Sequence, residues 1–351
     1  MSTLLIPAAG KSSRFPNMRP KWLLTHPTGK IMLEAVLESA NYLNFDRTIV
    51  VVLKDHCTRY DADVILRQVF GDRIEIVILD NPTSSAAETV YKAIKLAKIN
   101  GNIVIKDSDC IVEYRASESK NFIVGLTIDS SSNVERIQTK SFIIKNDDNI
   151  ILDVIEKEVV SNIICLGVYS LDCEDFNRSY ESIVDSDVYK LGGEIYVSHV
   201  VSYLILSGDV TFEHIEADKF VDWGTKDDWY KELANHNTYI FDIDGVLLTN
   251  YGKYGTKNHS NTFEPIEKNI SELKRLSDAG HQIIFMTART DKVLQQFREF
   301  LKERDIKYKT IISGCYHGRR ILINDFAPSN PYPSCDAISI RRNDFLERYS
   351  L

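Results

Sequence analysis

The hydrophobic pattern of the first hundred residues alternates between two periods. Short apolar runs bounded by polar residues predict buried parallel strands, and they cover residues 3–8, 48–53, 74–79 and 102–105. Between these runs, apolar residues recur at helical spacing over residues 31–43, 61–70 and 86–97. This strand–helix–strand series predicts an open α/β sheet with right-handed crossovers.

The pattern changes after residue 120. Residues 121–170 contain short β-rich segments separated by Asn/Asp turns, which predict added strands that form a wall over the sheet. Helical spacing returns over residues 175–184 and 194–206. The first part of the chain is therefore predicted to hold a Rossmann-like mixed sheet.

A second α/β series begins after a short helix and polar hinge at residues 227–237. It predicts strands over 238–241, 282–286, 308–312 and 321–323, and helices over 265–279 and 291–303. A chain of 351 residues is longer than one hydrophobic core usually supports. We therefore predict two α/β domains, residues 1–235 and 236–351.

Composition excludes several classes of function but does not identify one. The formal net charge of -8 argues against a nucleic-acid partner, because neutralising phosphates needs a basic surface, but nucleotides remain compatible. Six cysteines form no CxxC pair, so neither a zinc site nor a disulfide framework is expected. No apolar run reaches about 18 residues and no signal-peptide pattern is present, so we expect a cytoplasmic protein without membrane insertion.

The loop after the first predicted strand has the composition of an anion site. A glycine-containing loop between a strand and a helix presents backbone N–H groups to a phosphate. The loop comprises Ala8, Ala9, Gly10, Lys11, Ser12 and Ser13, and Arg14 and Lys21 add positive charge. An ordinary strand-to-helix turn with a surface arginine and lysine is the alternative.

The spacing of these residues resembles the signature of the sugar-phosphate nucleotidyltransferases. It reads Ala8-Ala9-Gly10-x-x-x-Arg14-Phe15, followed by Pro20-Lys21-x-Leu23. The resemblance implies a GT-A-like fold and transfer of a nucleotidyl group from a nucleoside triphosphate to a phosphorylated acceptor, with release of pyrophosphate. Arg14 and Lys21 would be catalytic.

Two aspartate motifs extend the resemblance. Asp107 and Asp109 follow a predicted strand at its carboxyl end, where open sheets bind ligands, and carboxylates suit Mg²⁺. Residues 221–225, Val-Asp-Trp-Gly-Thr, are similar to the family's second metal motif. By resemblance Asp109 and Asp222 would hold Mg²⁺, with Asp107 a close alternative; a solvated turn is the other interpretation of the first pair.

Substrate contacts follow from the same resemblance. Ser84 and Ser85 stand where the family touches the base, although the usual Gly-Thr pair is missing. Lys157 matches the lysine that meets the acceptor phosphate, and Glu194 would contact the acceptor or cap the next helix. Residues 19–22 and 222–225 look more like bacterial cytidylyltransferases of capsule and phospho-alcohol metabolism than like thymidylyltransferases, so CTP is the expected nucleotide.

The second domain resembles the haloacid dehalogenase superfamily. Asp242-Ile243-Asp244-Gly245 is similar to motif I, with Asp242 as the nucleophile and Asp244 as the acid and base. Thr287 matches motif II and would bind the phosphoryl group. Asp325 matches motif IV and would hold Mg²⁺ together with Asp242 and Asp244.

Two departures from that superfamily stand out. Asn324 replaces a second acid, and the motif III lysine is not evident, so Arg319 or Arg320 would substitute unless both are surface charges. The segment between motifs I and II is too short for a large cap. The site would be open, or closed by another domain or subunit, which leaves a homo-oligomer as an open alternative.

The leading hypothesis is a bifunctional enzyme of bacterial capsule or surface-polysaccharide precursor synthesis. It would transfer CMP to a sugar phosphate, polyol phosphate or small phospho-alcohol and hydrolyse a phosphate monoester in a Mg²⁺-dependent reaction. One alternative is a nucleotidyltransferase using CTP, UTP or dTTP with a non-catalytic second domain. The other is a nucleotide-binding regulatory protein.

Overall fold

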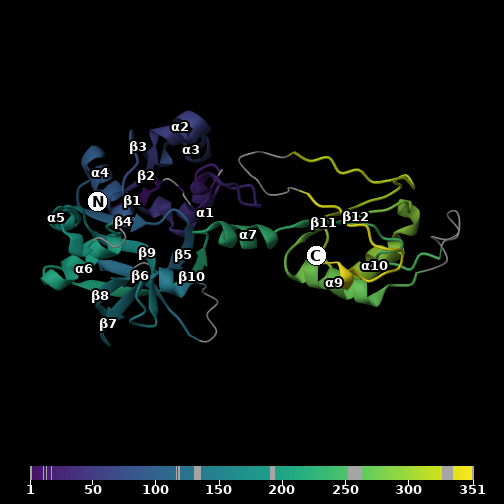
Figure 1. Ribbon diagram of the computed structural model, residues 1–351. Coiled ribbons are helices and arrows are strands. Elements are labelled where there is room, and N and C mark those ends of the chain that lie inside the picture. The colour runs from purple at the N-terminus through teal and green to yellow at the C-terminus, as the bar shows by residue number, and fades with distance from the viewer. Residues whose placement is uncertain are drawn as a thin grey trace. The chain divides into compact units, whose positions relative to one another are not determined.

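The chain forms two compact units in a computed structural model, Met1–Lys226 and Asp227–Leu351 (Figure 1). The structure describes residues 2–10, 12, 14–16, 18–115, 117, 119–129, 136–189, 194–251, 263–325 and 335–349. The boundary between the units falls at the start of helix α7 (Lys226–Ala234), whereas the sequence analysis placed this helix in the first domain.

Unit 1 is built on one mixed sheet, which has ten strands within the described residues. Its parallel half has the order β3-β2-β1-β4, and these strands are Glu75–Leu79, Arg47–Leu53, Ser2–Pro7 and Asn102–Lys106. All four coincide with predicted apolar runs to within one residue at each end. The predicted α/β class is therefore confirmed for this unit.

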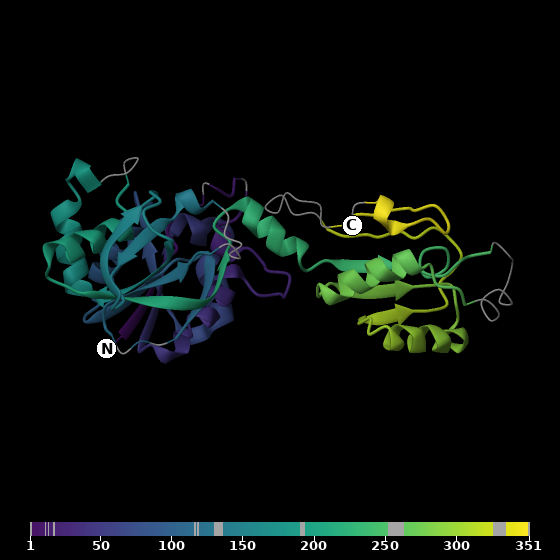
Figure 2. The same ribbon diagram turned by 90° about the horizontal axis from the view of Figure 1, so that it is seen from below.

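The other half of the sheet, whose strands are teal in Figure 2, is mostly antiparallel. It continues in the order β9-β6-β10-β8-β7, with β5 paired to β10. Its strands are β5 (Cys110–Tyr114), β6 (Phe122–Thr127), β7 (Ser141–Lys145), β8 (Ile150–Glu156), β9 (Ile163–Asp172) and β10 (Phe212–Asp222). Strands β6, β7, β8 and most of β9 are the predicted β-rich wall, whereas β5 and β10 were not predicted. The wall extends the parallel half rather than lying over it.

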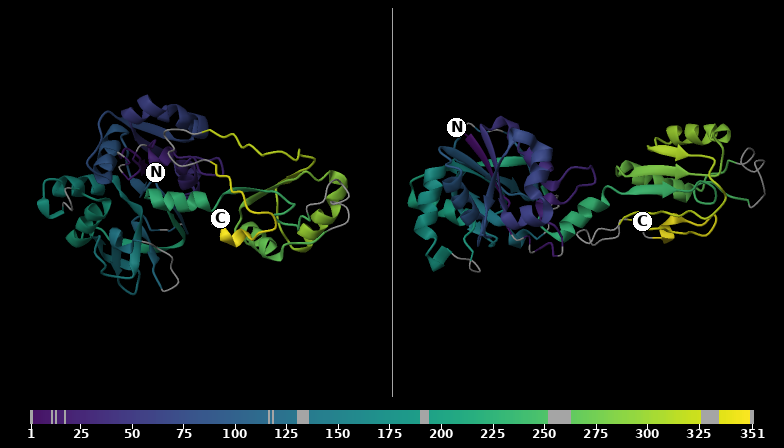
Figure 3. Two further views of the ribbon diagram at one scale, coloured as in Figure 1. Left: turned by 45° about the vertical axis from the view of Figure 1, so that its right-hand side comes forward. Right: turned by 90° about the horizontal axis from the view of Figure 1, so that it is seen from above.

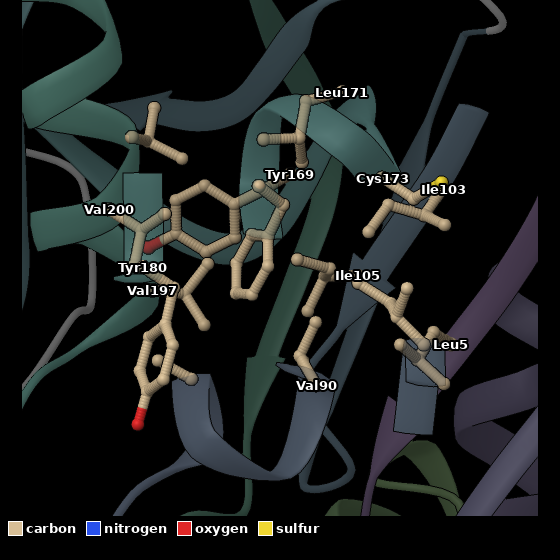
Figure 4. Packing of buried hydrophobic residues seen from close by; sticks show 14 of the residues in the cluster. Leu5, Val90, Ile103, Ile105, Tyr169, Leu171, Cys173, Tyr180, Val197 and Val200 are labelled. Carbon is tan, nitrogen blue, oxygen red and sulfur yellow. The ribbon is translucent and has the colours of Figure 1, made fainter. Parts of the chain in front are cut away.

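Helices cover both faces of this sheet because side chains alternate along each strand. Leu5 joins α4 (Ala86–Leu96), α5 (Cys173–Ile183) and α6 (Val197–Ser207) in one core (Figure 4). Leu4 and Ile6 join α1 (Met32–Ser39) and α3 (Ala62–Phe70) in the core of the opposite face, and α2 (Lys54–Tyr60) precedes α3. Each fully buried leucine or isoleucine contributes about 1.5–3 kcal/mol.

Unit 2 contains a smaller parallel sheet in the order β11-β12-β13 (Figure 3). The strands are Thr238–Phe241, Gln282–Met286 and Thr310–Ile312, and the helices are α9 (Glu267–Asp278) and α10 (Gln295–Glu303). Leu273 of α9 and Phe297 of α10 pack with Phe285 of β12 in one core. The first two strands match their predicted bounds at every residue.

Short 3-10 helices complete the described elements. They are η1 (Lys21–Leu23), η2 (Tyr42–Asn44), η3 (Gly71–Arg73), η4 (Ile137–Thr139), η5 (Asp187–Tyr189), η6 (Asp291–Val293) and η7 (Leu346–Arg348). The predicted helix over 291–303 is divided into η6 and α10. None of the described helices has the length and apolar character that crossing a lipid bilayer requires.

The predicted strand at residues 321–323 does not form. Ile321, Leu322 and Ile323 are 68%, 55% and 89% exposed and pair with no described strand. Apolar β-branched composition describes what fits a half-buried pleated surface, and it forms a strand only where a neighbour supplies backbone hydrogen bonds. The prediction was wrong because a three-residue run carries too little of that pairing to decide its own position.

A buried asparagine holds the second unit together. The Asn269 amide of α9 donates to the carbonyl oxygens of Val246 and Asp344 at 2.6 and 2.9 Å. Its side-chain oxygen accepts from the Leu346 amide at 2.8 Å, and the whole residue is buried. Asn269 thereby ties α9 both to the loop after β11 and to the C-terminal segment.

Replacing Asn269 by alanine should lower the free energy of unfolding of unit 2 by about 3 kcal/mol, since each buried polar group left unsatisfied costs about 1–3 kcal/mol. Urea unfolding followed by circular dichroism measures the change. Ser271→Ala, at an exposed position of the same helix, is the matched control. Equal midpoints for the two variants would show that the three hydrogen bonds do not stabilise the unit.

Candidate functional site

The glycine loop of unit 1 lies at the carboxyl end of β1. Ala8 and Ala9 are buried, one toward each core, whereas Gly10 is exposed with open space where a Cβ atom would lie. Ser12 has a positive φ of 49°, and its hydroxyl accepts from the Lys21 amide at 3.3 Å. This contact joins the loop to η1, so that Lys21 begins a turn fastened to the loop.

The other described residues of the loop differ in burial. Arg14 is solvent-exposed, and the following Phe15 is buried and anchors the loop. Lys11 and Ser13 lie outside the described residues. The loop therefore presents one exposed glycine and one exposed arginine beside the Lys21 turn.

Strand pairing brings the two predicted metal aspartates together. Cys110 of β5 lies opposite Asp222 of β10, and the Trp223 amide donates to the Asp109 carbonyl at 2.9 Å. A Cβ atom on Gly224 would lie 2.9 Å from Asp222 Oδ1 and 3.2 Å from Asp109 Oδ2. Both carboxylates thus face one small space that a glycine leaves open.

Two lysines occupy these carboxylates. Lys21 Nζ pairs with Asp109 Oδ2, and Lys140 Nζ pairs with Asp222 Oδ2. Lys140 follows η4 and immediately precedes β7, and the sequence analysis did not identify it. A single lysine before a strand is too common to predict a functional site. Only the fold shows that Lys140 lies beside Asp222.

Charge and burial shift the pKa values of this cluster in opposite directions. Burial acts to raise the pKa of Asp109, but the Lys21 ammonium outweighs it and holds that pKa below its ordinary value. Burial, with the charge of Asp109 adding to it, raises the pKa of Asp107 to about 6. Burial acts to lower the pKa of Lys140, and Asp222 more than compensates. Asp109 is therefore the better ionised ligand of the first pair.

The aspartate turn rests on a buried cation. Lys106 is fully buried and its ammonium donates to the Cys110 carbonyl at 2.7 Å, with the Cys110 sulfur at 3.2 Å. The Asp107 amide donates to the Gly167 carbonyl at 3.0 Å. The Asp107 carboxylate fills the space where a side chain at residue 167 would begin, and Gly167 has a φ of +69°.

The predicted acceptor residues meet at a tyrosine. Lys157 Nζ lies 2.5 Å from the Tyr196 hydroxyl, which also hydrogen-bonds with Glu194. Helix α6 begins after Tyr196, so Glu194 is not its N-cap. The neighbouring Glu156 accepts from the hydroxyls of Ser141 and Ser198 at 2.5 and 2.6 Å. Glu156 precedes Lys157 in the sequence and Tyr196 lies two residues after Glu194, but no role was predicted for either from the sequence.

The two serines predicted to touch the base have a structural task in this chain. Ser85 is the N-cap of α4 and accepts from the Glu88 amide at 3.2 Å. The amide and hydroxyl of Ser84 donate to the Glu88 carboxylate at 2.6 and 2.7 Å. These contacts cap a helix beside the parallel sheet, and a base contact by either serine stays a prediction.

Unit 2 gathers its predicted residues at the carboxyl ends of two adjacent parallel strands. Asp242 and Asp244 follow β11, and the buried Thr287 follows β12. The buried Arg289 binds Asp244 through Nε at 3.1 and 3.0 Å and through Nη2 at 2.7 Å. Arg289 lies two residues after Thr287, and no role was predicted for it from the sequence.

The predicted basic residue (Arg319 or Arg320) and Asp325 do not follow strands in the way that Asp242, Asp244 and Thr287 do. Arg320 Nη2 lies 3.6 Å from Asp242 Oδ1, whereas Arg319 is an exposed neighbour for which the structure shows no such ion pair. Burial raises the pKa of Asp242, and the Arg320 guanidinium counteracts part of that effect. Asp325 is exposed and follows the segment that does not form a strand, so the structure does not place it at a strand end.

Solved structures show which fold unit 1 has. A nucleoside-diphosphate-sugar pyrophosphorylase from Vibrio cholerae is 20% identical, with 66% of this chain and 99% of that chain covered and a TM-score of 0.56. An inositol-1-phosphate CTP transferase from T. maritima is 13% identical, covering 66% and 94%, with a TM-score of 0.52. A UDP-glucose pyrophosphorylase complexed with UDP-glucose is 14% identical, covering 67% and 97%, with a TM-score of 0.51.

Sequence comparison adds no closer relation. No protein-family model matches the chain, and no curated protein matches it. The α/β unit with the large mixed sheet therefore has a nucleotidyltransferase fold on structural similarity alone. The three neighbours cover about two-thirds of the chain.

Gly167→Ala should destabilise unit 1 through a collision with Asp107. A positive φ costs a non-glycine residue about 1–2 kcal/mol, and overpacking adds about 1–3 kcal/mol. Gly208→Ala is the matched control, because Gly208 has a φ of +75° but open space around its missing Cβ. Urea unfolding should show a larger loss for Gly167→Ala, and equal losses would mean that the Asp107 carboxylate moves aside freely.

Proposed function

We propose that unit 1 transfers a nucleotidyl group from a nucleoside triphosphate to the phosphate of a small acceptor and releases pyrophosphate. The observation that supports this most directly is the convergence of Asp109 and Asp222 beside Gly224, with Lys21 and the glycine loop adjacent. The similar fold of solved nucleotidyltransferases agrees with it.

The donor set at this point fits a divalent cation. Asp109 and Asp222 offer hard carboxylate oxygens, which Mg²⁺ prefers, and two ammonium groups already act as counter-ions to them. Asp107 is the alternative ligand from the same turn. When bound, Mg²⁺ would neutralise charge on the triphosphate and polarise its α-phosphate.

The protein residues have separate tasks in the proposed reaction. The N–H groups of the glycine loop, Arg14 and Lys21 bind the triphosphate, and Lys157 and Glu194 hold the acceptor. An oxygen of the acceptor phosphate forms a bond to the α-phosphorus while the bond from that phosphorus to pyrophosphate breaks. Pyrophosphate leaves with the electron pair, and no covalent enzyme intermediate is needed. Positioning and charge neutralisation supply the rate enhancement.

CTP is the proposed nucleotide because residues 19–22 and 222–225 resemble those of bacterial cytidylyltransferases. The structurally similar proteins do not decide the base, since one is a CTP transferase and another was solved with UDP-glucose. A pyrophosphate-release assay of four nucleoside triphosphates against sugar phosphates, polyol phosphates and phospho-alcohols tests the assignment. CTP should be preferred with at least one acceptor; equal use of UTP or dTTP would contradict the cytidylyl assignment.

Asp109→Asn and Asp222→Asn should each lower kcat for pyrophosphate release by about 100-fold or more, because charge stabilisation in the transition state is lost. Asp218→Asn is the matched control, since Asp218 is an exposed residue of the same strand β10. The idea fails if the Asp222 variant keeps the activity of the control.

Unit 2 supports a second proposed activity, Mg²⁺-dependent hydrolysis of a phosphate monoester. Asp242 would attack the phosphorus and release the alcohol, and water would then cleave the acyl phosphate. Thr287 and Arg320 would bind the phosphoryl oxygens, with Arg319 the alternative basic residue. The observation that favours this activity is the placement of Asp242, Asp244 and Thr287 at neighbouring strand ends.

The Arg289 pair constrains this second activity. Arg289 contacts both oxygens of Asp244, so the proposed acid and base is already engaged by a buried cation. Asp325 would share Mg²⁺ with Asp242 and Asp244. The engagement of Asp244 favours a slow or specialised phosphatase, as part of an enzyme for bacterial surface-polysaccharide precursors.

Asp242→Asn should abolish phosphate monoester hydrolysis and leave pyrophosphate release unchanged, because the nucleophile is lost only in unit 2. The control is Asp305→Asn, at an exposed position of the same unit. A wild-type chain that releases pyrophosphate but hydrolyses no phosphate monoester would make unit 2 a non-catalytic module. Nucleotide binding with neither activity would support a regulatory protein.

A further inference from the structure

Lys140 has a position that the proposed transferase roles do not yet use. Its ammonium pairs with Asp222, and the two side chains are 21% and 25% exposed. Charges that are partly buried are screened less than surface charges, so this pair contributes more than an exposed lysine would. The lysine is therefore held at the candidate metal carboxylate rather than projecting into solvent.

The backbone of Lys140 is fixed on the acceptor side of the same site. Its carbonyl accepts from the Lys157 amide at 3.0 Å. The next residue, Ser141, lies opposite Glu156 in the β7–β8 ladder and donates to its carboxylate at 2.5 Å. Lys140 thus lies between Asp222 and the cluster of Lys157, Glu156 and Tyr196.

Binding of a divalent cation at Asp222 favours displacement of the Lys140 ammonium. Lys140 and a divalent cation compete for the charge of the Asp222 carboxylate, and a cation that binds both carboxylate oxygens displaces the ammonium from Oδ2. A half-buried ammonium without a counter-charge is costly, and it takes the nearest available anion. Asp109 is then occupied by the same metal ion, and the backbone contact with Lys157 places Lys140 beside the proposed acceptor phosphate.

We propose that Lys140 neutralises Asp222 in the metal-free chain and binds the acceptor phosphate once a divalent cation takes its place. The inference rests on the proposed transferase function and deepens it. Lys140 stays protonated and donates to a non-attacking phosphate oxygen, while another oxygen of that phosphate attacks the α-phosphorus and pyrophosphate departs. Two lysines, 140 and 157, then offset the charge of the acceptor as it approaches the triphosphate.

Calorimetry with Lys140→Met tests the exchange. In Mn²⁺ titrations without nucleotide, the variant should bind the ion about threefold or more tightly, because a competing cation is gone. With Mn²⁺ saturating, its affinity for inorganic phosphate should fall about tenfold or more, the loss expected for a charged hydrogen bond. Lys145→Met is the matched control, since Lys145 ends the same strand, is bonded to Asn149, and should match the wild type.

Unchanged or weaker Mn²⁺ binding by Lys140→Met would overturn the inference, and so would unchanged phosphate binding. Lys140→Gln serves as a second variant if the methionine lowers the unfolding temperature, and it should show the same two changes. Failure of the proposed function is seen separately. A wild type that binds Mn²⁺ and phosphate but releases no pyrophosphate with any nucleotide contradicts the transferase, while the exchange at Lys140 is still measured.

Discussion

The candidate transferase site depends on one strand pairing, the antiparallel ladder between β5 and β10. This ladder joins residues more than a hundred positions apart and sets Asp222 opposite Cys110, one residue from Asp109. Gly224 keeps the resulting space open, and the buried Lys106 supports the aspartate turn from below. Without the ladder, the two aspartates would be solvated turn residues at the ends of separate strands, and neither would favour a metal ion by itself.

Much of the fold could be predicted because its signals are local. The apolar runs of β1, β2, β11 and β12 and the helical spacing of α3, α4 and α9 follow directly from alternation and periodicity along the chain. The common position of Asp109, Asp222 and Lys21 could also be predicted, because each belongs to a short motif with defined spacing, whereas their roles stay predictions. The contacts of Lys140, Tyr196 and Glu156 could not, because they form only when distant strands align.

In unit 2, too, the sequence does not predict contacts between distant segments. Residues 321–323 have the composition of a strand, but composition does not specify which sheet edge a segment pairs with, and here it pairs with no described strand. The Arg289–Asp244 pair could not be predicted either, although Asp244 belongs to motif I and Arg289 lies two residues after Thr287. Motif spacing predicts which side chains lie at the same edge of the sheet. Only the three-dimensional structure shows which of these side chains are already paired with a neighbour.

The cysteine beneath the aspartate turn has a consequence for redox chemistry. Burial raises the pKa of the Cys110 thiol to about 12, and its sulfur lies against the Lys106 ammonium. Oxidants and alkylating reagents attack the thiolate, which this residue does not form near neutral pH. The turn that carries Asp107 and Asp109 is thereby insulated from oxidative stress, whereas the exposed Cys335 of the other unit is open to modification. A thiol-reactive probe can therefore modify Cys335 while the Cys110 thiol beneath the aspartate turn stays unmodified.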